Sequence, residues 1–177
     1  MKHVYVAASA AGLMLLGAGI GFAARQPTGP GVQVIQGKPD KEAGLAALAE
    51  AEHLAGSGSW ELIAVGRVYY LSGDKAKAQT LFDRATGGKA GSGDWLRLAD
   101  VYAEAGETSK ADDCYQKALA VDPKDDGVQA QVGAWDIRNG QRAKGEELLA
   151  KAWQKNPDEI WHYLRASEAL LKVPPGR

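Results

Sequence analysis

Cysteine and histidine are scarce in this sequence of 177 residues. The single cysteine, Cys114, excludes a disulfide within the chain and any metal site built from several thiolates. The histidines are His3, His53 and His162, and no two have the i, i+4 spacing that places two metal ligands on one helix face. We therefore expect no metal ion and no cofactor. Cys114, His53 and His162 are expected to be ordinary surface or partly packed residues.

An excess of charge is also missing. Lys and Arg number 21 and Asp and Glu 22, which gives a formal net charge of −1. Because no basic excess is present to neutralise a phosphate backbone, the composition argues against nucleic acid as a partner. The sequence has no G-x-S-x-G motif and no P-loop, and acidic pairs such as Asp112–Asp113 point about 100° apart on a helix. We expect the protein not to be an enzyme.

The N-terminal 24 residues have the features of a targeting segment. Lys2 and His3 precede an uncharged run over residues 4–24, which has small residues, Gly21 and Ala23, near its end. This pattern fits a cleaved signal peptide, and the run is also long enough to be an uncleaved membrane anchor. Both alternatives place the rest of the chain across a membrane. We expect a periplasmic protein, or one anchored in the inner membrane through residues 4–24 and facing the periplasm.

Residues 25–39 are rich in proline and glycine and are expected to form a linker, with residues 32–35 as a single extended segment. Beyond the linker, alanine and glycine are abundant and only two phenylalanines occur in the whole chain. Small residues favour closely packed helices over a β-sandwich, which requires branched and aromatic side chains at alternating positions.

The chain after the linker repeats itself. Gly73, Gly106 and Gly140 are 33 and 34 residues apart, and each follows an apolar-periodic segment of about a dozen residues. Each glycine is expected to end a helix in the left-handed conformation. Second helical patterns follow at residues 75–85, 109–120 and 142–155. The sequence therefore predicts αα-hairpins of about 34 residues.

The middle unit resembles the tetratricopeptide repeat, whose pattern is W-x2-L-G-x2-Y, then A-x3-F, then P. Its matching residues are Trp95, Leu98, Ala99, Tyr102, Ala111, Tyr115, Ala118 and Pro123. The first unit matches at Leu62, Val65, Gly66, Tyr69, Ala78, Phe82 and Ala85. The third unit keeps Val132, Gly133, Ala152 and Pro157, but has Gln129, Asp136, Gly145 and Leu149 where the family has Trp, Tyr, Ala and Phe. The resemblance covers residues 59–157.

An array of such units requires end caps, because an unmatched unit exposes an apolar face. Residues 40–54, with Asp40 as the N-cap, match the second helix of the first unit after a shift of 34 residues. Residues 158–172 form one further helix, with Tyr163, Ala166, Leu170 and Leu171 available for packing. We expect an all-α, right-handed superhelix over residues 40–172, built from a half-repeat, three repeats and a capping helix, followed by a tail at 173–177.

The resemblance implies that the first helix of each unit lines a concave groove, the usual binding surface of such arrays. The residues on this side that packing does not require are Ile63, Arg67, Tyr70, Leu96, Asp100, Glu104, Gln131, Arg138, Trp161 and Arg165. This mixture of apolar and charged groups suits a peptide or helix held by a few apolar anchors and oriented by charge.

We therefore expect a scaffold or adaptor that binds another protein in the bacterial cell envelope. The resemblance places such proteins in the assembly of pili, secretion complexes, outer-membrane machines or cytochromes. A polysaccharide-binding accessory protein is the alternative, with Trp60, Tyr70 and Trp161 stacking on sugar rings. The sequence names no partner and leaves self-association open.

Overall fold

A computed structural model describes residues 31–176 of the chain and contains eight α-helices there. The helices are α1 (Asp40–Ala55), α2 (Ser59–Leu71), α3 (Lys75–Thr86), α4 (Ser92–Glu104), α5 (Thr108–Val121), α6 (Asp126–Arg138), α7 (Arg142–Lys155) and α8 (Ile160–Leu170). Within this part of the chain no strand is present. The predicted signal peptide or anchor at 1–24 lies outside the described residues.

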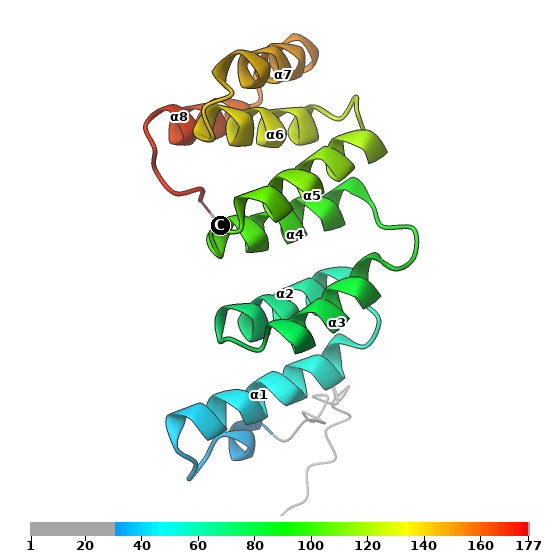
Figure 1. Ribbon diagram of the computed structural model, residues 1–177, viewed down its shortest axis with the longest axis vertical. Coiled ribbons are helices and arrows are strands. Elements are labelled where there is room, and N and C mark those ends of the chain that lie inside the picture. Colours follow the sequence, from blue (N-terminus) through cyan, green and yellow to red (C-terminus); the bar gives the residue numbers. More distant parts are fainter. Residues whose placement is uncertain (1–30, 177) are drawn as a thin grey trace, which may run out of the picture.

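The helices form a stack of hairpins (Figure 1). Helices α2 and α3 form the first unit, α4 and α5 the second and α6 and α7 the third, with α1 at one end of the stack and α8 at the other. The predicted all-α repeat architecture is therefore confirmed. The three predicted second helices agree with α3, α5 and α7 to within one residue at each end.

The turn inside each hairpin depends on a glycine with a positive φ. Gly73 has a φ of +104°, and the next backbone N–H, that of Asp74, donates to the Tyr69 carbonyl at 2.9 Å. A left-handed residue at this place satisfies a carbonyl at the end of α2, and glycine adopts it without steric cost. The Asp74 side chain then accepts from the Lys77 N–H at 3.0 Å and caps α3. One turn thus ends one helix and starts the next.

Two local predictions near the N-terminal end of the stack are wrong. Asp40 is the first residue of α1 rather than its N-cap, which is Pro39, and its side chain makes no capping hydrogen bond. Residues 31–34 form a single 3₁₀ turn, η1, instead of an extended segment. The turn contacts α1, and Ile35 and Gln36 both donate to the Val32 carbonyl. The described residues contain no strand with which this segment could pair, so its backbone forms local hydrogen bonds instead.

Small residues set the distance between the two helices of a unit. A Cβ atom on Gly66 would lie 2.5 Å from the Phe82 ring, which is fully buried. In the third unit the backbones themselves meet, because a Cβ atom on Gly145 would lie 2.3 Å from the Gly133 carbonyl oxygen. Real side chains do not tolerate such distances, so glycine at these positions permits the close approach of the helices.

Neighbouring units are joined through a continuous core of aromatic and aliphatic side chains that extends from α1 to α7. At the first junction the rings of Tyr70, Phe82 and Tyr102 lie 5.5–5.9 Å apart in tilted and edge-on pairs. At the second, the ring of Trp135 lies 4.8 Å from that of Tyr115. A smaller apolar cluster connects α6, α7 and α8.

The final helix packs differently from the prediction. Ala166 is buried as expected, but Tyr163, Leu170 and Leu171 are exposed. His162, expected at the surface or only partly packed, is buried, because α8 turns this side chain toward α6. None of the described helices is long and apolar enough to cross a membrane.

Candidate partner-binding surface

The first helices of the units form the inner side of the stack. Cα atoms of α2 and α4, of α4 and α6, and of α6 and α8 approach within 8 Å of one another. Among the described residues, those of the successive second helices, α3 with α5 and α5 with α7, do not. A stack whose first helices lie closer together than its second helices curves toward the first helices. We call the exposed and half-buried side chains on the curved side of these helices the inner row. It consists of Trp60, Ala64, Arg67, Arg97, Asp100, Glu104, Gln131, Trp161 and Arg165.

The inner row begins with a charged pair that connects two units. The Arg67 guanidinium on α2 makes two hydrogen bonds to the Glu104 carboxylate on α4, one of them from Nε at 2.5 Å. This two-point geometry fixes both side chains more firmly than a single contact. The Glu104 carboxylate raises the pKa of Arg67 above its ordinary value. Both side chains remain about one-third exposed, so a partner can reach them.

Asp100 of α4 lies at the centre of the inner row and accepts hydrogen bonds from two other helices. Its Oδ1 accepts from the Tyr115 hydroxyl of α5 at 2.5 Å and from the Gln131 amide of α6 at 3.1 Å. Burial raises the pKa of Asp100, although these two hydrogen bonds and the positive charges of Arg165 and Arg97 act in the opposite direction. The side chain is open to water but surrounded by protein. An acidic group in such a place attracts cations more strongly than one on an open surface.

A shallow depression closes the inner row at the α8 end. It is lined by Asp125, Asp126, Gly127, Glu159, Trp161, His162 and Arg165. His162 Nε2 lies 3.5 Å from Asp126 Oδ2, and Lys155 Nζ lies 3.0 Å from Asp126 Oδ1. The hydrogen bond from Lys155 is the main cause of the lowered pKa of Asp126. Trp161 and Arg165, both predicted from the sequence, therefore lie side by side with an acidic cluster.

For two residues, the prediction that they are anchors in the groove is wrong. Ile63 and Tyr70 are only 2% and 3% exposed, so neither can contact a partner. Both side chains belong to the continuous core, and the Tyr70 ring meets that of Tyr102 in the next unit. Leu96 is half-buried against the same core, and Arg138 is half-buried near the end of α6. Of the predicted residues, Arg67 therefore pairs with Glu104 and Asp100 with Gln131 on the inner row. The first unit contributes no apolar anchor from the predicted set.

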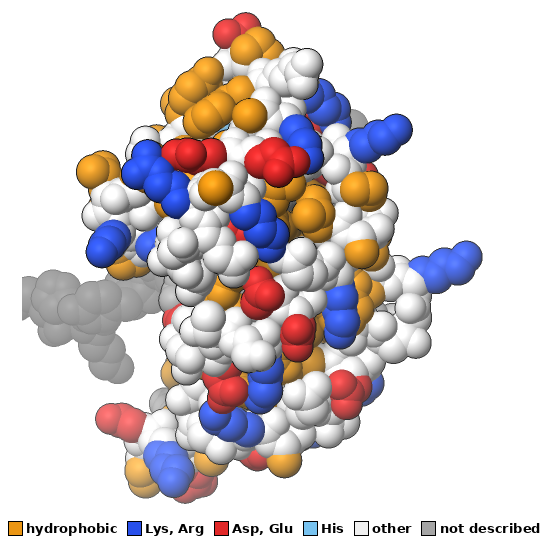
Figure 2. Space-filling view, turned by 45° about the horizontal axis from the view of Figure 1, so that its top comes forward, with side chains coloured by type: hydrophobic (Ala, Val, Ile, Leu, Met, Phe, Trp, Pro, Cys, Tyr) orange, Lys and Arg blue, Asp and Glu red, His pale blue; other side chains and the backbone are white. Residues whose placement is uncertain are grey.

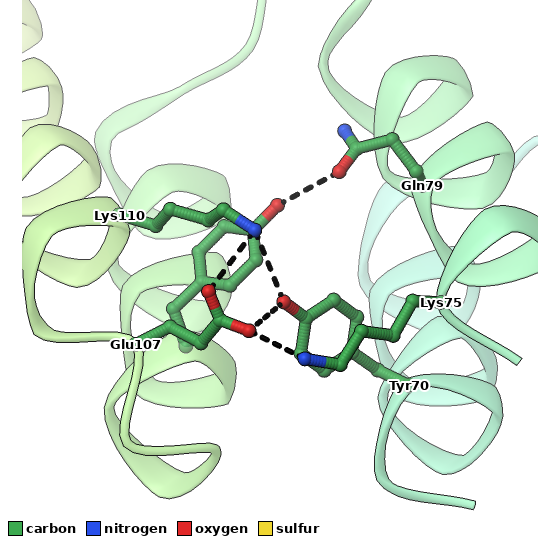
Figure 3. A network of polar contacts seen from close by, with 6 residues as sticks. Tyr70, Lys75, Gln79, Glu107 and Lys110 are labelled. Carbon is green, nitrogen blue, oxygen red and sulfur yellow. Dashed lines mark hydrogen bonds and ion pairs between the residues drawn. The ribbon is translucent and has the colours of Figure 1, made fainter. Parts of the chain in front are cut away.

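Tyr70 is instead the centre of a polar junction between the first two units (Figure 3). Its hydroxyl donates to Glu107 at 2.8 Å and accepts from Lys110 at 3.2 Å. Lys75 Nζ lies 2.6 Å from Glu107 and 4.8 Å from the centre of the Tyr70 ring. Hydrogen bonds from Lys75, Tyr70 and Lys110 lower the pKa of Glu107 to about 2. The junction holds two units in register.

Sequence reasoning missed an exposed aromatic platform. The Arg97 guanidinium of α4 lies 3.7 Å above the ring of Trp60 on α2, and the Trp60 side chain is still more than half exposed. Such stacking attracts the cation to the ring and fixes the orientation of both side chains. The sequence does contain a signal for this contact, because Trp60 and Arg97 lie on consecutive first helices.

Figure 2 shows acidic and basic side chains interspersed over the face that it presents, which agrees with the balanced charge of the sequence. Among residues 31–176 there is no group of three or more His, Cys, Asp or Glu side chains that could hold a metal ion. The described surface therefore offers mixed polar and aromatic contacts.

Comparisons with known proteins agree with the hairpin architecture. Residues 93–125, which contain the second unit, match the sequence model of the tetratricopeptide repeat. The solved crystal structure of MamA has a similar fold, with a TM-score of 0.52 and 17% sequence identity over 75% of this chain and 80% of that chain. At this identity the likeness establishes the fold alone. No match is found among curated proteins.

Proposed function

We propose that this chain is a protein-interaction scaffold, with no catalytic role of its own, and that the inner row is its binding surface. The observation that carries the proposal is the central carboxylate of Asp100, which three helices surround and which water still reaches. Curved repeat arrays bind extended or helical segments along their inner side. The tetratricopeptide match in the second unit supports the same use of this fold.

The chemistry of the inner row suggests the partner segment. A lysine or arginine of the partner would approach Asp100, where low polarity strengthens the attraction. A carboxylate of the partner would approach Arg97 or Arg165, which lie close enough to influence Asp100. Trp60 and Trp161, both exposed, provide apolar contact area at the two ends of the row. The partner is thus a protein segment with charges of both signs and an apolar residue toward each end.

We also propose that the chain acts in the cell envelope, where it supports the assembly of a protein complex. The basis is the pattern of residues 1–24, a short basic start followed by an uncharged run of targeting length. The polysaccharide alternative is weakened, because one of its three aromatic residues, Tyr70, is buried and Arg97 covers one face of Trp60. Fractionation of cells, followed by N-terminal sequencing, tests export. A full-length product in the soluble cytoplasmic fraction would contradict it.

Photo-crosslinking tests the binding surface. A photoreactive amino acid is placed in the full chain at Ala64 or Gln131 on the inner row, and at Asp113 or Gln154 on the second helices as matched controls. The proposal predicts adducts to one distinct protein from the inner positions and none from the controls. Asp100→Asn should reduce those adducts severalfold without changing the helical circular dichroism signal. Equal adducts from both sets, or adducts from the controls alone, would show that the inner row is not the binding surface.

A further inference from the structure

The two ends of the stack carry opposite halves of a repeat. A shift of 34 residues aligns α8 with the first helices, so that Ser167 takes the place of Gly133, and Leu170 the place of Asp136. In α2, α4 and α6 the residues at these two places are buried, and the second helix of the same unit contributes to the contact, as Lys110 of α5 does over the Tyr102 ring. In α8 both are exposed: Leu170 is 48% exposed, whereas Tyr102 at the same place in α4 is 5% exposed. Helix α8 is therefore a first helix whose second helix is missing from the described part of the chain.

The other end shows the reverse situation. Helix α1 aligns with the second helices, and Gly44 takes the place of Ala78, Ala111 and Gly145, all of which are buried. Gly44 is exposed, and a Cβ atom added to it would meet nothing within 4 Å. Helix α1 is thus a second helix whose contact face for a first helix is open to solvent at Gly44, although Leu48 on the same face is buried.

A second position supports this view of the α1 end. Val68 of α2 is 44% exposed, whereas Val101 at the same place in α4 is 3% exposed. The residues that follow at this place, Trp135 and Ala169, are buried too. Helices α4, α6 and α8 each have a preceding first helix beside them, and α2 has none among the described residues. A first helix packed on α1 would cover Val68 as well.

We propose that α8 of one copy packs against α1 of a second copy and completes a fourth repeat between the two chains. The association is head to tail. Each end supplies what the other lacks, and the apolar side chains exposed at the α8 end would become covered. They include Tyr163, Leu164, Leu170 and Leu171. Figure 2 shows apolar side chains gathered toward this end of the stack. Monomers rarely expose apolar surface in such quantity unless it binds something.

The side chains at the two ends match in size. In complete units a large residue of the second helix packs on the small residue of the first, as Phe82 does on Gly66 and Leu149 on Gly133. Between copies the corresponding pair is Ser167 with Leu48, which is already buried within its own chain and would need little additional covering. Leucine is smaller than phenylalanine and serine is larger than glycine, so the sum of the two volumes stays close to that of the first unit.

They match in polarity as well. Within each unit the residue aligned with Leu170 meets a lysine of the second helix: Tyr69 with Lys77, Tyr102 with Lys110, and Asp136 with Lys144. Between copies both members change together, to Leu170 and Ala43. An apolar residue thus meets an apolar residue at the one junction where the lysine is missing.

The two ends differ in kind, since α1 presents a second helix and α8 presents a first helix. Because the contact surfaces differ, the association does not close on itself after two copies, and it extends the inner row from one chain into the next.

Two cysteine variants of the full chain test the register of the contact. Gly44→Cys and Ser167→Cys place thiols at the positions that correspond to the close contact of Gly145 with Gly133. The native Cys114 is buried, and burial raises the pKa of its thiol to about 11, so it reacts slowly. Under mild oxidation a mixture of the two single variants should give a disulfide-linked dimer, and the double variant should give a ladder of higher species. Either single variant alone should remain uncrosslinked. Crosslinking of Ser167→Cys with itself, or no product in the mixture, would overturn the proposal.

Sedimentation velocity of the full chain provides a second measurement that needs no cysteine. The average mass should rise with concentration, and Leu170→Glu should raise the dissociation constant at least about tenfold, because an unpaired carboxylate would be buried at the contact. Val121→Glu is the matched control, since Val121 is equally exposed at the end of α5 and lies away from both ends of the stack. A mass that does not change with concentration, or equal effects of the two substitutions, would mean that α8 and α1 do not meet between copies. The occupant of the α8 face would then be another segment of the same chain or a different protein.

Discussion

The repeat pattern and the geometry of this chain predict opposite effects on stability when Gly145 is replaced by alanine. Alanine is the family residue at this place, and Ala78 and Ala111 occupy it in the first two units. From the pattern alone, Gly145→Ala should stabilise α7 by about 1 kcal/mol, the helix propensity difference between the two residues. The structure predicts the opposite sign.

The expected magnitude follows from the contacts of the added methyl group. Its carbon would lie 2.3 Å from the Gly133 carbonyl oxygen, 2.6 Å from Ile137 Cγ1 and 3.0 Å from the Ile137 amide nitrogen. Two of these three neighbours are backbone atoms, so no rotamer change can relieve the clash. The helices must separate by about 1 Å, and forced overpacking of this kind costs about 1–3 kcal/mol or more. After subtraction of the propensity gain of about 1 kcal/mol, we expect the free energy of unfolding to fall by up to about 2 kcal/mol.

Urea unfolding followed by circular dichroism at 222 nm measures the change, and hydrogen exchange of the α6 and α7 amides locates it. Gly44→Ala is the control, because the same substitution on α1 meets open space and should raise the free energy of unfolding by up to about 1 kcal/mol. Opposite signs for the two variants would confirm the reasoning. If Gly145→Ala is as stable as the natural chain or more stable, the close approach of α6 and α7 is not a determinant of stability.

Three further predictions concern the unit junction and the helix ends. In urea unfolding, Tyr70→Ala should lower the free energy of unfolding by about 3–5 kcal/mol and Tyr70→Phe by about 1 kcal/mol. If Tyr70→Ala lost partner binding without losing stability, Tyr70 would be a groove residue after all. Because its pKa is lowered to about 2, ionised Glu107 stabilises the fold above the ordinary carboxyl pKa of about 4.3, and this contribution disappears as the pH falls toward 2. Glu107→Gln should therefore make the urea midpoint less dependent on pH in that interval, and an unchanged profile would refute the pairing. Lys172 has a φ of +57° after α8, so Lys172→Gly should stabilise the chain by about 1 kcal/mol in thermal unfolding; an unchanged or lower midpoint would refute this.

The sequence was sufficient to predict the hairpins because their determinants are local. A left-handed turn requires a residue such as Gly73, and the helices on either side follow an apolar period that is visible in one dimension. The small residue of each first helix and the large residue of each second helix recur at a fixed spacing, so the register of Gly66 with Phe82 could be predicted before any contact was known.

The orientation of side chains toward a neighbouring unit could not be predicted in the same way. Tyr69 and Tyr70 are adjacent and equally large, and the repeat pattern assigns only the first of them to packing within the unit. Tyr70 is buried by the next unit, because its ring meets Phe82 and Tyr102 at the junction. Conversely, Leu170 was expected to pack, and it is exposed because no second helix follows α8 in the described residues. Both errors concern contacts between units, which a pattern within one unit does not encode.

The third unit departs from the repeat pattern at several positions. Asp136 stands where the pattern has a tyrosine, and Gly145, in place of alanine, lets the backbones of α6 and α7 meet. The buried carboxylate is bonded to Lys144 at 3.2 Å, and the buried Gln129, which replaces tryptophan, donates to the Pro123 carbonyl at 2.8 Å. Burial nevertheless raises the pKa of Asp136, and its second oxygen accepts no hydrogen bond from the described residues. Alanine at position 145 should therefore harm this unit even though the repeat pattern has alanine there, because the backbone of α6 leaves no room for its methyl group.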